Sequence, residues 1–149
     1  MSTLILLVED NPSDEKLTLL AFKKCSVANE VIVVRDGAAA LDFLFSEGAY
    51  ANRPPETSPA IVLLDLKLPK VDGLEVLRRL RADARTRHLP VVMLTASKED
   101  EDVLRSYALG ANAYVRKPVD FAEFARAANT LGLFWLQLNE TAPRSKGGA

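Results

Sequence analysis

The sequence has very little of what stabilises a small secreted protein or crosses a membrane. One cysteine in 149 residues leaves no partner for a disulfide within the chain, which fits a reducing compartment. The apolar run near the N-terminus, residues 4–8, is ended at once by two acidic residues, so we expect no secretory signal. No stretch approaches the roughly 18 apolar residues of a membrane helix. We therefore expect a cytoplasmic protein without a membrane partner.

An excess of charge of one sign is also missing. The formal net charge is −1, so no global field attracts nucleic acid, and we expect no nucleic-acid partner. The composition is 48% apolar and 26% charged, which is the balance of an ordinary globular protein and excludes a disordered chain. The length corresponds to one domain that can bury its own core.

Five short apolar runs alternate with longer amphipathic segments. Continuous apolarity within each run indicates strands buried on both faces, as in a parallel sheet covered by helices. Capping residues precede the amphipathic segments and predict five helices. The runs are 4–8, 31–34, 61–64, 91–94 and 113–115, and the caps are Asn11, Asp36, Asp72, Ser97 and Asp120. This order predicts a doubly wound α/β fold with five parallel strands and five helices.

Two segments depart from this alternation. Residues 46–59 form a long polar connection that contains three prolines, which predicts a surface loop. Residues 141–149 are polar and contain a proline and two adjacent glycines. We therefore expect one folded domain over residues 1–140, followed by a flexible C-terminal tail.

Polar side chains follow the predicted strands where each strand ends. Glu9 and Asp10 follow the first strand, Asp65 the third, Thr95 the fourth and Lys117 the fifth. If the strand order is 2-1-3-4-5, the three carboxylates converge where the order reverses, and their repulsion calls for a cation such as Mg²⁺. Lys117 and Thr95 then stabilise a transferring phosphoryl group that Asp65 attacks in line, which gives an acyl phosphate. No P-loop or G-x-G-x-x-G pattern occurs, so we do not expect a nucleotide as donor.

Four segments together resemble the signature blocks of bacterial response-regulator receiver domains, the CheY-like family of two-component signalling. They are residues 4–12, 62–73, 94–97 and 110–118, and in this order and spacing they are highly specific. The resemblance covers about residues 3–138 and implies a flavodoxin-like sheet of order 2-1-3-4-5. It also implies a stand-alone receiver without an output domain. Such a protein is not an enzyme beyond its own Mg²⁺-dependent phosphorylation and dephosphorylation.

The resemblance implies a role for the residues of the acidic cluster. Asp65 takes the phosphoryl group from a phosphohistidine on a sensor histidine kinase. The side chains of Glu9, Asp10 and Asp65 hold Mg²⁺ or Mn²⁺. The backbone carbonyl of Lys67 is a further metal ligand. Residues 9–14, with the sequence Glu-Asp-Asn-Pro-Ser-Asp, and the long loop before the third strand resemble small receivers paired with phytochrome-type kinases. This resemblance implies such a kinase as the partner.

A second group of residues is implied to act around the phosphoryl group. Thr95 supplies the switch hydroxyl. Tyr114 is implied to be the aromatic that rotates with it, although a tyrosine at this position is also typical of a half-buried strand. The bond Lys117–Pro118 is implied to be a cis peptide, which is uncommon enough to be a placed feature. Lys67 and Ser97 flank the route of an attacking water, so we expect them to tune the hydrolysis of the acyl phosphate.

The predicted last helix carries more apolar surface than one face of a domain can bury. Leu131 and Trp135 follow the spacing of a core face, whereas Phe134 adds apolar surface on another face. With Tyr114 these residues predict a homodimer through the fourth helix, the fifth strand and the fifth helix. Phosphorylation would then be coupled to the geometry of the dimer. The alternative is a chain end that curls back and covers its own domain.

Two other functions use similar residues. A metal-dependent phosphohydrolase also forms an aspartyl phosphate, but its Asp-x-Asp motif is missing because Leu66 and Lys67 follow Asp65. A binding scaffold with a pocket that no longer works is the second alternative, and every residue type of a working pocket is present. The receiver function is therefore our prediction. The pattern names neither the kinase nor the target, and it leaves open whether the protein is an output, a phosphate sink or a relay.

Overall fold

Five parallel strands form one sheet in the order β2-β1-β3-β4-β5, which confirms the predicted topology. The computed structural model describes residues 3–24, 28–54, 58–117, 122–123, 126 and 129–130. The strands are β1 Thr3–Val8, β2 Asn29–Val34, β3 Ile61–Leu64, β4 Val91–Thr95 and β5 Ala113–Arg116. The helices are α1 Pro12–Lys23, α2 Gly37–Leu44, α3 Gly73–Ala82 and α4 Asp100–Ala108, with a short 3-10 helix, η1, at Gly48–Tyr50.

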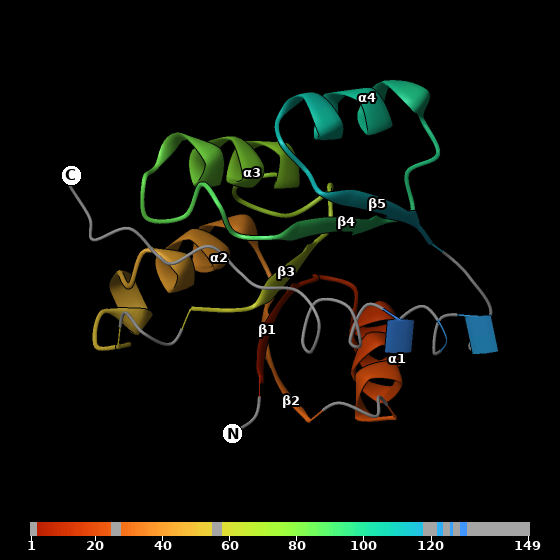
Figure 1. Cartoon of the computed structure of the whole chain (residues 1–149), viewed down its shortest axis with the longest axis horizontal. Helices are drawn as coiled ribbons and strands as arrows, with labels where there is room; N and C mark the ends of the chain where they lie inside the picture. Colours follow the sequence, from red (N-terminus) through yellow and green to blue (C-terminus); the bar gives the residue numbers. More distant parts are fainter. Residues whose placement is uncertain are drawn as a thin grey trace.

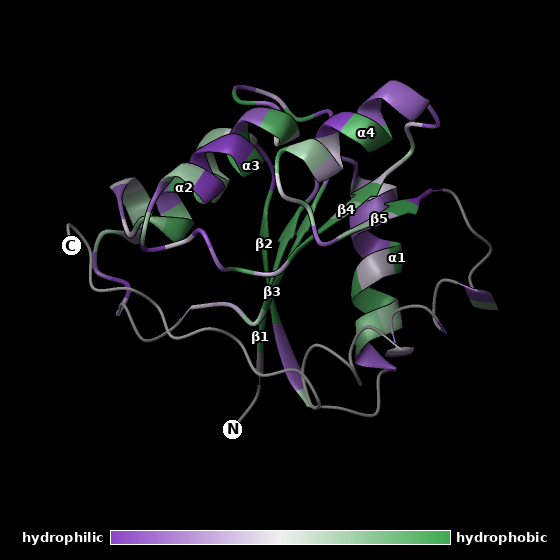
Figure 2. Cartoon of the chain, turned by 45° about the horizontal axis from the view of Figure 1, so that its top comes forward, coloured by the Kyte–Doolittle hydropathy of each residue, from purple (hydrophilic) through white to green (hydrophobic). Residues whose placement is uncertain are grey.

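Helices cover both faces of the sheet, with α1 on one side and α2 and α3 on the other (Figure 1). Successive strand residues therefore enter two different cores. Leu6 of β1 lies in the core under α2 and α3, whereas its neighbour Leu7 lies in the core under α1. Both leucines are at most 1% exposed. Burial on both faces is the reason why the central strands are apolar without alternation, as Figure 2 shows.

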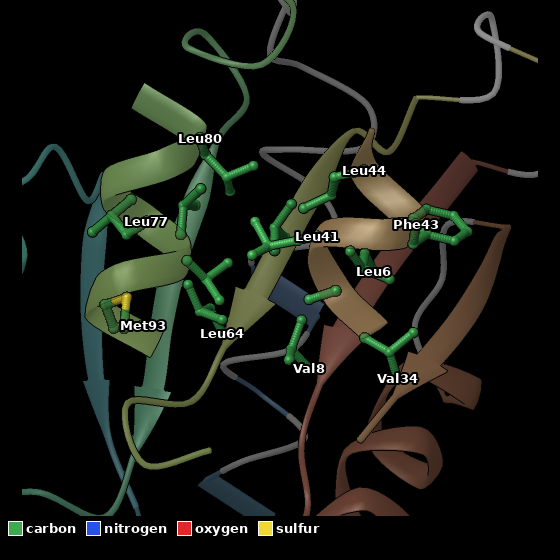
Figure 3. Close-up of a cluster of buried hydrophobic side chains, with 14 of the residues drawn as sticks. Leu6, Val8, Val34, Leu41, Phe43, Leu44, Leu64, Leu77, Leu80 and Met93 are labelled. Carbon is green, nitrogen blue, oxygen red and sulfur yellow. The ribbon is translucent and has the colours of Figure 1, made fainter. Parts of the chain in front are cut away.

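The larger core lies between the sheet and the pair α2 and α3. Leu41 and Leu44 of α2 face Leu77 and Leu80 of α3 across the ends of strand side chains (Figure 3). All four leucines are at most 7% exposed. This packing holds α3 against β3, whose C-terminal end leads directly into Asp65. No helix in the described part of the chain has the length and apolarity needed to cross a membrane.

Three of the predicted helix caps are confirmed. The side chain of Asn11 accepts hydrogen bonds from the backbone N–H groups of Ser13 and Asp14 at 2.9 and 3.1 Å. Asp36 and Asp72 each accept one from the backbone three residues later, at 2.7 and 3.0 Å. These bonds satisfy donors that the first helical turn leaves without an intrahelical partner.

The predicted cap at Ser97 is wrong. The helix α4 begins at Asp100, and its N-cap is Glu99, which makes no side-chain capping bond. The hydroxyl of Ser97 instead donates to a carboxylate oxygen of Asp102 at 2.6 Å. The Ser97 oxygen also accepts from the backbone N–H of Glu99 at 3.4 Å, but that residue precedes the helix, so Ser97 orders the loop before α4 and does not cap its first turn.

The predicted fifth helix and the C-terminal end lie largely outside the described residues. The described positions 122–123, 126 and 129–130 are helical, in agreement with the prediction. The expected cap Asp120 and the expected tail, residues 141–149, lie outside the described part, so both stay predictions.

The long connection between α2 and β3 is largely exposed in its described residues, as expected of a surface loop, and contacts with α2 order part of it. It contains η1, and the ring of Tyr50 meets the ring of Phe43 edge-on, with 5.1 Å between their centroids. The guanidinium of Arg53 lies 4.3 Å from the centroid of the Phe43 ring, and its Nε donates to the Phe43 carbonyl at 2.9 Å. The last carbonyls of a helix lack intrahelical donors, and this arginine supplies one.

Candidate functional site

Three carboxylates meet at the carboxyl ends of β1 and β3. The two strands pair in register with Val8 opposite Leu64, so the residues that follow them are neighbours. The backbone N–H of Asp65 donates to the Val8 carbonyl at 3.2 Å. Glu9, Asp10 and Asp65 each offer a carboxylate oxygen, and these atoms all lie within 4.8 Å of one another. The structure therefore brings together the predicted acidic cluster where the strand order reverses.

The ammonium group of Lys117 lies against this cluster. The side chain of Lys117 is 5% exposed, and its backbone N–H donates to the Thr95 carbonyl at 2.7 Å, which fixes the lysine beside β4. Its Nζ donates to Oε1 of Glu9, to Oδ2 of Asp14 at 2.9 Å and to Oδ2 of Asp65 at 3.5 Å. A buried ammonium needs such partners because the interior solvates charge poorly.

Burial and charge compete in setting the ionisation of this group of residues. Burial raises the pKa of Glu9 to about 7, although the hydrogen bond from Lys117 acts in the opposite direction. Burial lowers the pKa of Lys117, but the hydrogen bonds to Glu9 and Asp14 outweigh it, and the net pKa is raised. Lys117 is therefore a permanent cation here, while Glu9 can change its protonation near neutral pH.

The loop after Asp65 is held by two close backbone approaches. A Cβ atom at position 73 would lie 2.0 Å from the Asp65 carbonyl oxygen, and one at position 37 would lie 1.7 Å from the carbonyl oxygen of Val71. Glycine is needed at Gly37 and Gly73 for this contact. The N–H of Gly73 also donates to the Leu66 carbonyl at 2.7 Å. The N-terminus of α3 thus fixes the backbone that carries Asp65.

The predicted switch residues lie along β4 and β5, next to the acidic cluster. Thr95 ends β4 and is 2% exposed, and its Oγ1 accepts from the Ser97 N–H at 3.4 Å. The hydroxyl of Tyr114 donates to the Ser97 carbonyl at 3.2 Å, so the tyrosine is tied to the loop that follows Thr95. Tyr114 is half-buried, and burial raises the pKa of its phenol.

The geometry also shows where the predictions were incomplete. Asp14 lies in the first turn of α1 and was not predicted as a site residue, so its contact with Lys117 was missed. The two residues are 103 positions apart, and no local pattern reports such a pair. The backbone N–H of Lys67 lies 3.4 Å from Oδ1 of Asp65, which places Lys67 at the site without testing its role as a metal ligand.

Four residues predicted for the site or the dimer interface lie outside the described residues. They are Pro118, Leu131, Phe134 and Trp135. The expected cis peptide and most of the expected dimer interface are therefore still predictions.

The chain is similar in sequence and structure to known response regulators. The chain is 39% identical to the response regulator Rcp1 of Synechocystis sp. over 133 residues, which are 89% of this chain and 88% of Rcp1. The crystal structure of the Mn²⁺-bound form of Rcp1 superposes with a TM-score of 0.84 at 37% identity, and the match covers 95% of this chain and 99% of that one.

Two further solved structures extend this similarity. The phosphorylated cyanobacterial phytochrome response regulator RcpA has a TM-score of 0.87 at 36% identity, and the match covers 96% of this chain and 100% of RcpA. The bacteriophytochrome response regulator AtBRR is 58% identical over 94% of this chain and 99% of its own, with a TM-score of 0.75. The chain matches the response regulator receiver domain family over residues 5–129. It belongs to this family, and is a receiver domain of two-component signalling with a CheY-like fold.

Proposed function

We propose that Asp65 accepts a phosphoryl group from a phosphohistidine of a sensor histidine kinase. The observation that carries this proposal is the position of Asp65 between two further carboxylates and the ammonium of Lys117. Asp65 is 9% exposed, so an entering group still reaches its oxygens. In the transfer, the phosphorus–nitrogen bond of the donor breaks as a bond from phosphorus to a carboxylate oxygen forms. The imidazole leaves with the electron pair and takes up a proton.

The cofactor of this reaction is Mg²⁺ or Mn²⁺, which receiver domains bind. The donor set fits, because Glu9, Asp10 and Asp65 present hard carboxylate oxygens within 4.8 Å of one another. The backbone carbonyl of Lys67 would be a further ligand. When bound, the ion offsets the repulsion among the carboxylates and the charge of the phosphoryl oxygens. The Mn²⁺-bound form of the relative Rcp1 supports this assignment.

Lys117 and Thr95 would contact the phosphoryl oxygens. The ammonium already lies 3.5 Å from Oδ2 of Asp65, and the hydroxyl of Thr95 sits at the end of the neighbouring strand. A shift of Thr95 toward the phosphoryl group would change the loop that binds the hydroxyl of Tyr114 through Ser97. The signal would therefore leave the site along this path. Ser97 and Lys67 would tune hydrolysis of the acyl phosphate.

The signalling partner would be a phytochrome-type histidine kinase in the cytoplasm. RcpA and AtBRR, whose structures match nearly the whole chain, are phytochrome and bacteriophytochrome response regulators. The protein would not turn over an external substrate repeatedly. It would promote only the transfer of the phosphoryl group to its own Asp65 and the later hydrolysis of that acyl phosphate.

We further propose a homodimer through the face formed by α4, β5 and the fifth helix. On α4, Leu104 is 70% exposed and Tyr107 is 49% exposed, and both are large apolar side chains three positions apart on one side of the helix. Tyr114 of β5 would link this face to the phosphorylation site. The predicted interface residues Leu131, Phe134 and Trp135 would complete it.

The phosphoacceptor role predicts a specific loss. Incubation with acetyl phosphate and Mg²⁺ should add the mass of one phosphoryl group to the wild-type protein and none to Asp65→Asn, because the amide is not a nucleophile. Intact-protein mass spectrometry measures this. Asp100→Asn is the matched control, since its side chain is 95% exposed, and it should be phosphorylated like the wild type. Equal phosphorylation of Asp65→Asn would contradict the proposal.

The raised pKa of Glu9 predicts that Mg²⁺ binding depends on pH. Above about pH 7 Glu9 is mostly ionised and free to bind, whereas below this value the metal must displace a proton. Mg²⁺ should therefore bind about tenfold more weakly at about pH 6 than at about pH 8. Calorimetric titration at the two pH values measures the ratio. The ratio should approach one in Glu9→Gln, and a wild-type ratio below about twofold would contradict the raised pKa of Glu9.

The dimer proposal predicts that a charge on α4 breaks the assembly. The wild type should sediment as a dimer at high micromolar concentration, and Leu104→Asp should sediment as a monomer because a buried carboxylate is costly. Leu20→Asp on α1 is the control, since Leu20 is 40% exposed but lies on another helix, and it should remain dimeric. A monomeric wild type, or a dimeric Leu104→Asp variant, would refute the interface.

A further inference from the structure

Lys117 has three carboxylate partners, and only two of them also belong to the cluster that could hold a metal ion. Glu9 and Asp65 belong to the cluster whose oxygens lie within 4.8 Å of one another, whereas Asp14 does not. A cation in that cluster would draw the oxygens of Glu9 and Asp65 toward itself. The ammonium of Lys117 would then keep only one carboxylate partner that binds neither the metal nor the phosphoryl group. That partner is Asp14, at 2.9 Å.

Asp14 is held in place by the start of α1. Its backbone N–H donates to the capping side chain of Asn11 at 3.1 Å, and its carbonyl accepts from the hydroxyl of Thr18 at 2.8 Å. Thr18 is fully buried, so this bond fixes the first turn of the helix against the core. The side chain of Asp14 is 33% exposed, whereas that of Lys117 is 5% exposed, so the carboxylate lies nearer the solvent than the ammonium does. The backbone that carries this carboxylate has a defined position that does not depend on the metal.

We propose that Asp14 is a positioning residue for Lys117, which rests on the function proposed above. Its carboxylate holds the ammonium beside Asp65 when the carboxylates of Glu9 and Asp65 coordinate the metal. Without this partner, the flexible four-carbon chain of Lys117 has no charge that keeps it in place before the phosphoryl group arrives. Asp14 touches neither phosphoryl group nor metal in this role, and it acts through Lys117 alone.

The test separates positioning from metal binding and from folding. In Asp14→Asn, the rate of phosphorylation by acetyl phosphate at saturating Mg²⁺ should fall by about tenfold, a typical effect of a misplaced charged group. The dissociation constant of Mg²⁺, measured by calorimetry without phosphoryl donor, should change by less than about threefold, because Asp14 is not a ligand. The control Glu15→Gln removes a charge from the same helical turn, but Glu15 pairs with Arg35 at 3.0 Å. Its rate should stay within about twofold of the wild type.

A second measurement asks whether Asp14 acts through Lys117. Beryllofluoride with Mg²⁺ mimics the phosphorylated aspartate, and its dissociation constant can be measured even where phosphorylation is slow. Asp14→Asn should weaken beryllofluoride binding in the wild-type background and have no further effect in Lys117→Gln. A rate within twofold of the wild type for Asp14→Asn, or equal losses in both backgrounds, would overturn the proposal. Absence of any phosphorylation of the wild-type protein would instead overturn the function of Asp65.

Discussion

The structure depends on the balance of charge around one buried ammonium. Lys117 joins the end of β5 to carboxylates of Glu9, Asp14 and Asp65, so three segments far apart in the sequence meet at one point. The carboxylates outnumber the cation, and burial already raises the pKa of Glu9 to about 7. A site with this surplus of negative charge attracts a divalent cation. It then accepts an anionic group only if the cation and the ammonium act together.

The rest of the fold serves to hold these groups at fixed positions. Helices on both faces bury the central strands β1, β3 and β4, and the register between β1 and β3 places Glu9 beside Asp65. The close approach of Gly73 to the Asp65 carbonyl fixes the backbone after the strand. The cap at Asn11 fixes the first turn of α1. Pre-formed positions matter because a charged group displaced by even one ångström loses much of its effect on a transition state.

Much of this arrangement was predictable from the sequence, for identifiable reasons. A strand buried on both faces must be apolar throughout, so runs such as 61–64 coincide with the observed strand. Caps such as Asn11 and Asp72 act over three residues, within reach of a local pattern. The carboxyl ends of parallel strands lie at the same edge of the sheet, which is why the cluster itself was predictable. The roles of its members came from the resemblance to the receiver family.

What could not be predicted depends on contacts between distant segments. Ser97 looked like a cap, but α4 starts three residues later, and the Ser97 hydroxyl instead donates to the carboxylate of Asp102 within that helix. Asp14 looked like a helix-terminal charge, because such a residue is favourable there in any helix. Its second role follows only from the position of Lys117. The connection before β3 looked polar throughout, yet Arg53 and Tyr50 tie part of it to Phe43.

The central claim is that the acyl phosphate forms on one residue of this cluster. Borohydride reduces an acyl phosphate of aspartate to homoserine, so the modified position can be read by peptide mass spectrometry. After phosphorylation by acetyl phosphate and Mg²⁺, homoserine should appear at position 65 and not at Asp10, and the five-carbon alcohol formed from a glutamyl phosphate should not appear at Glu9. Modification elsewhere, with Asp65 recovered unchanged, would contradict the account.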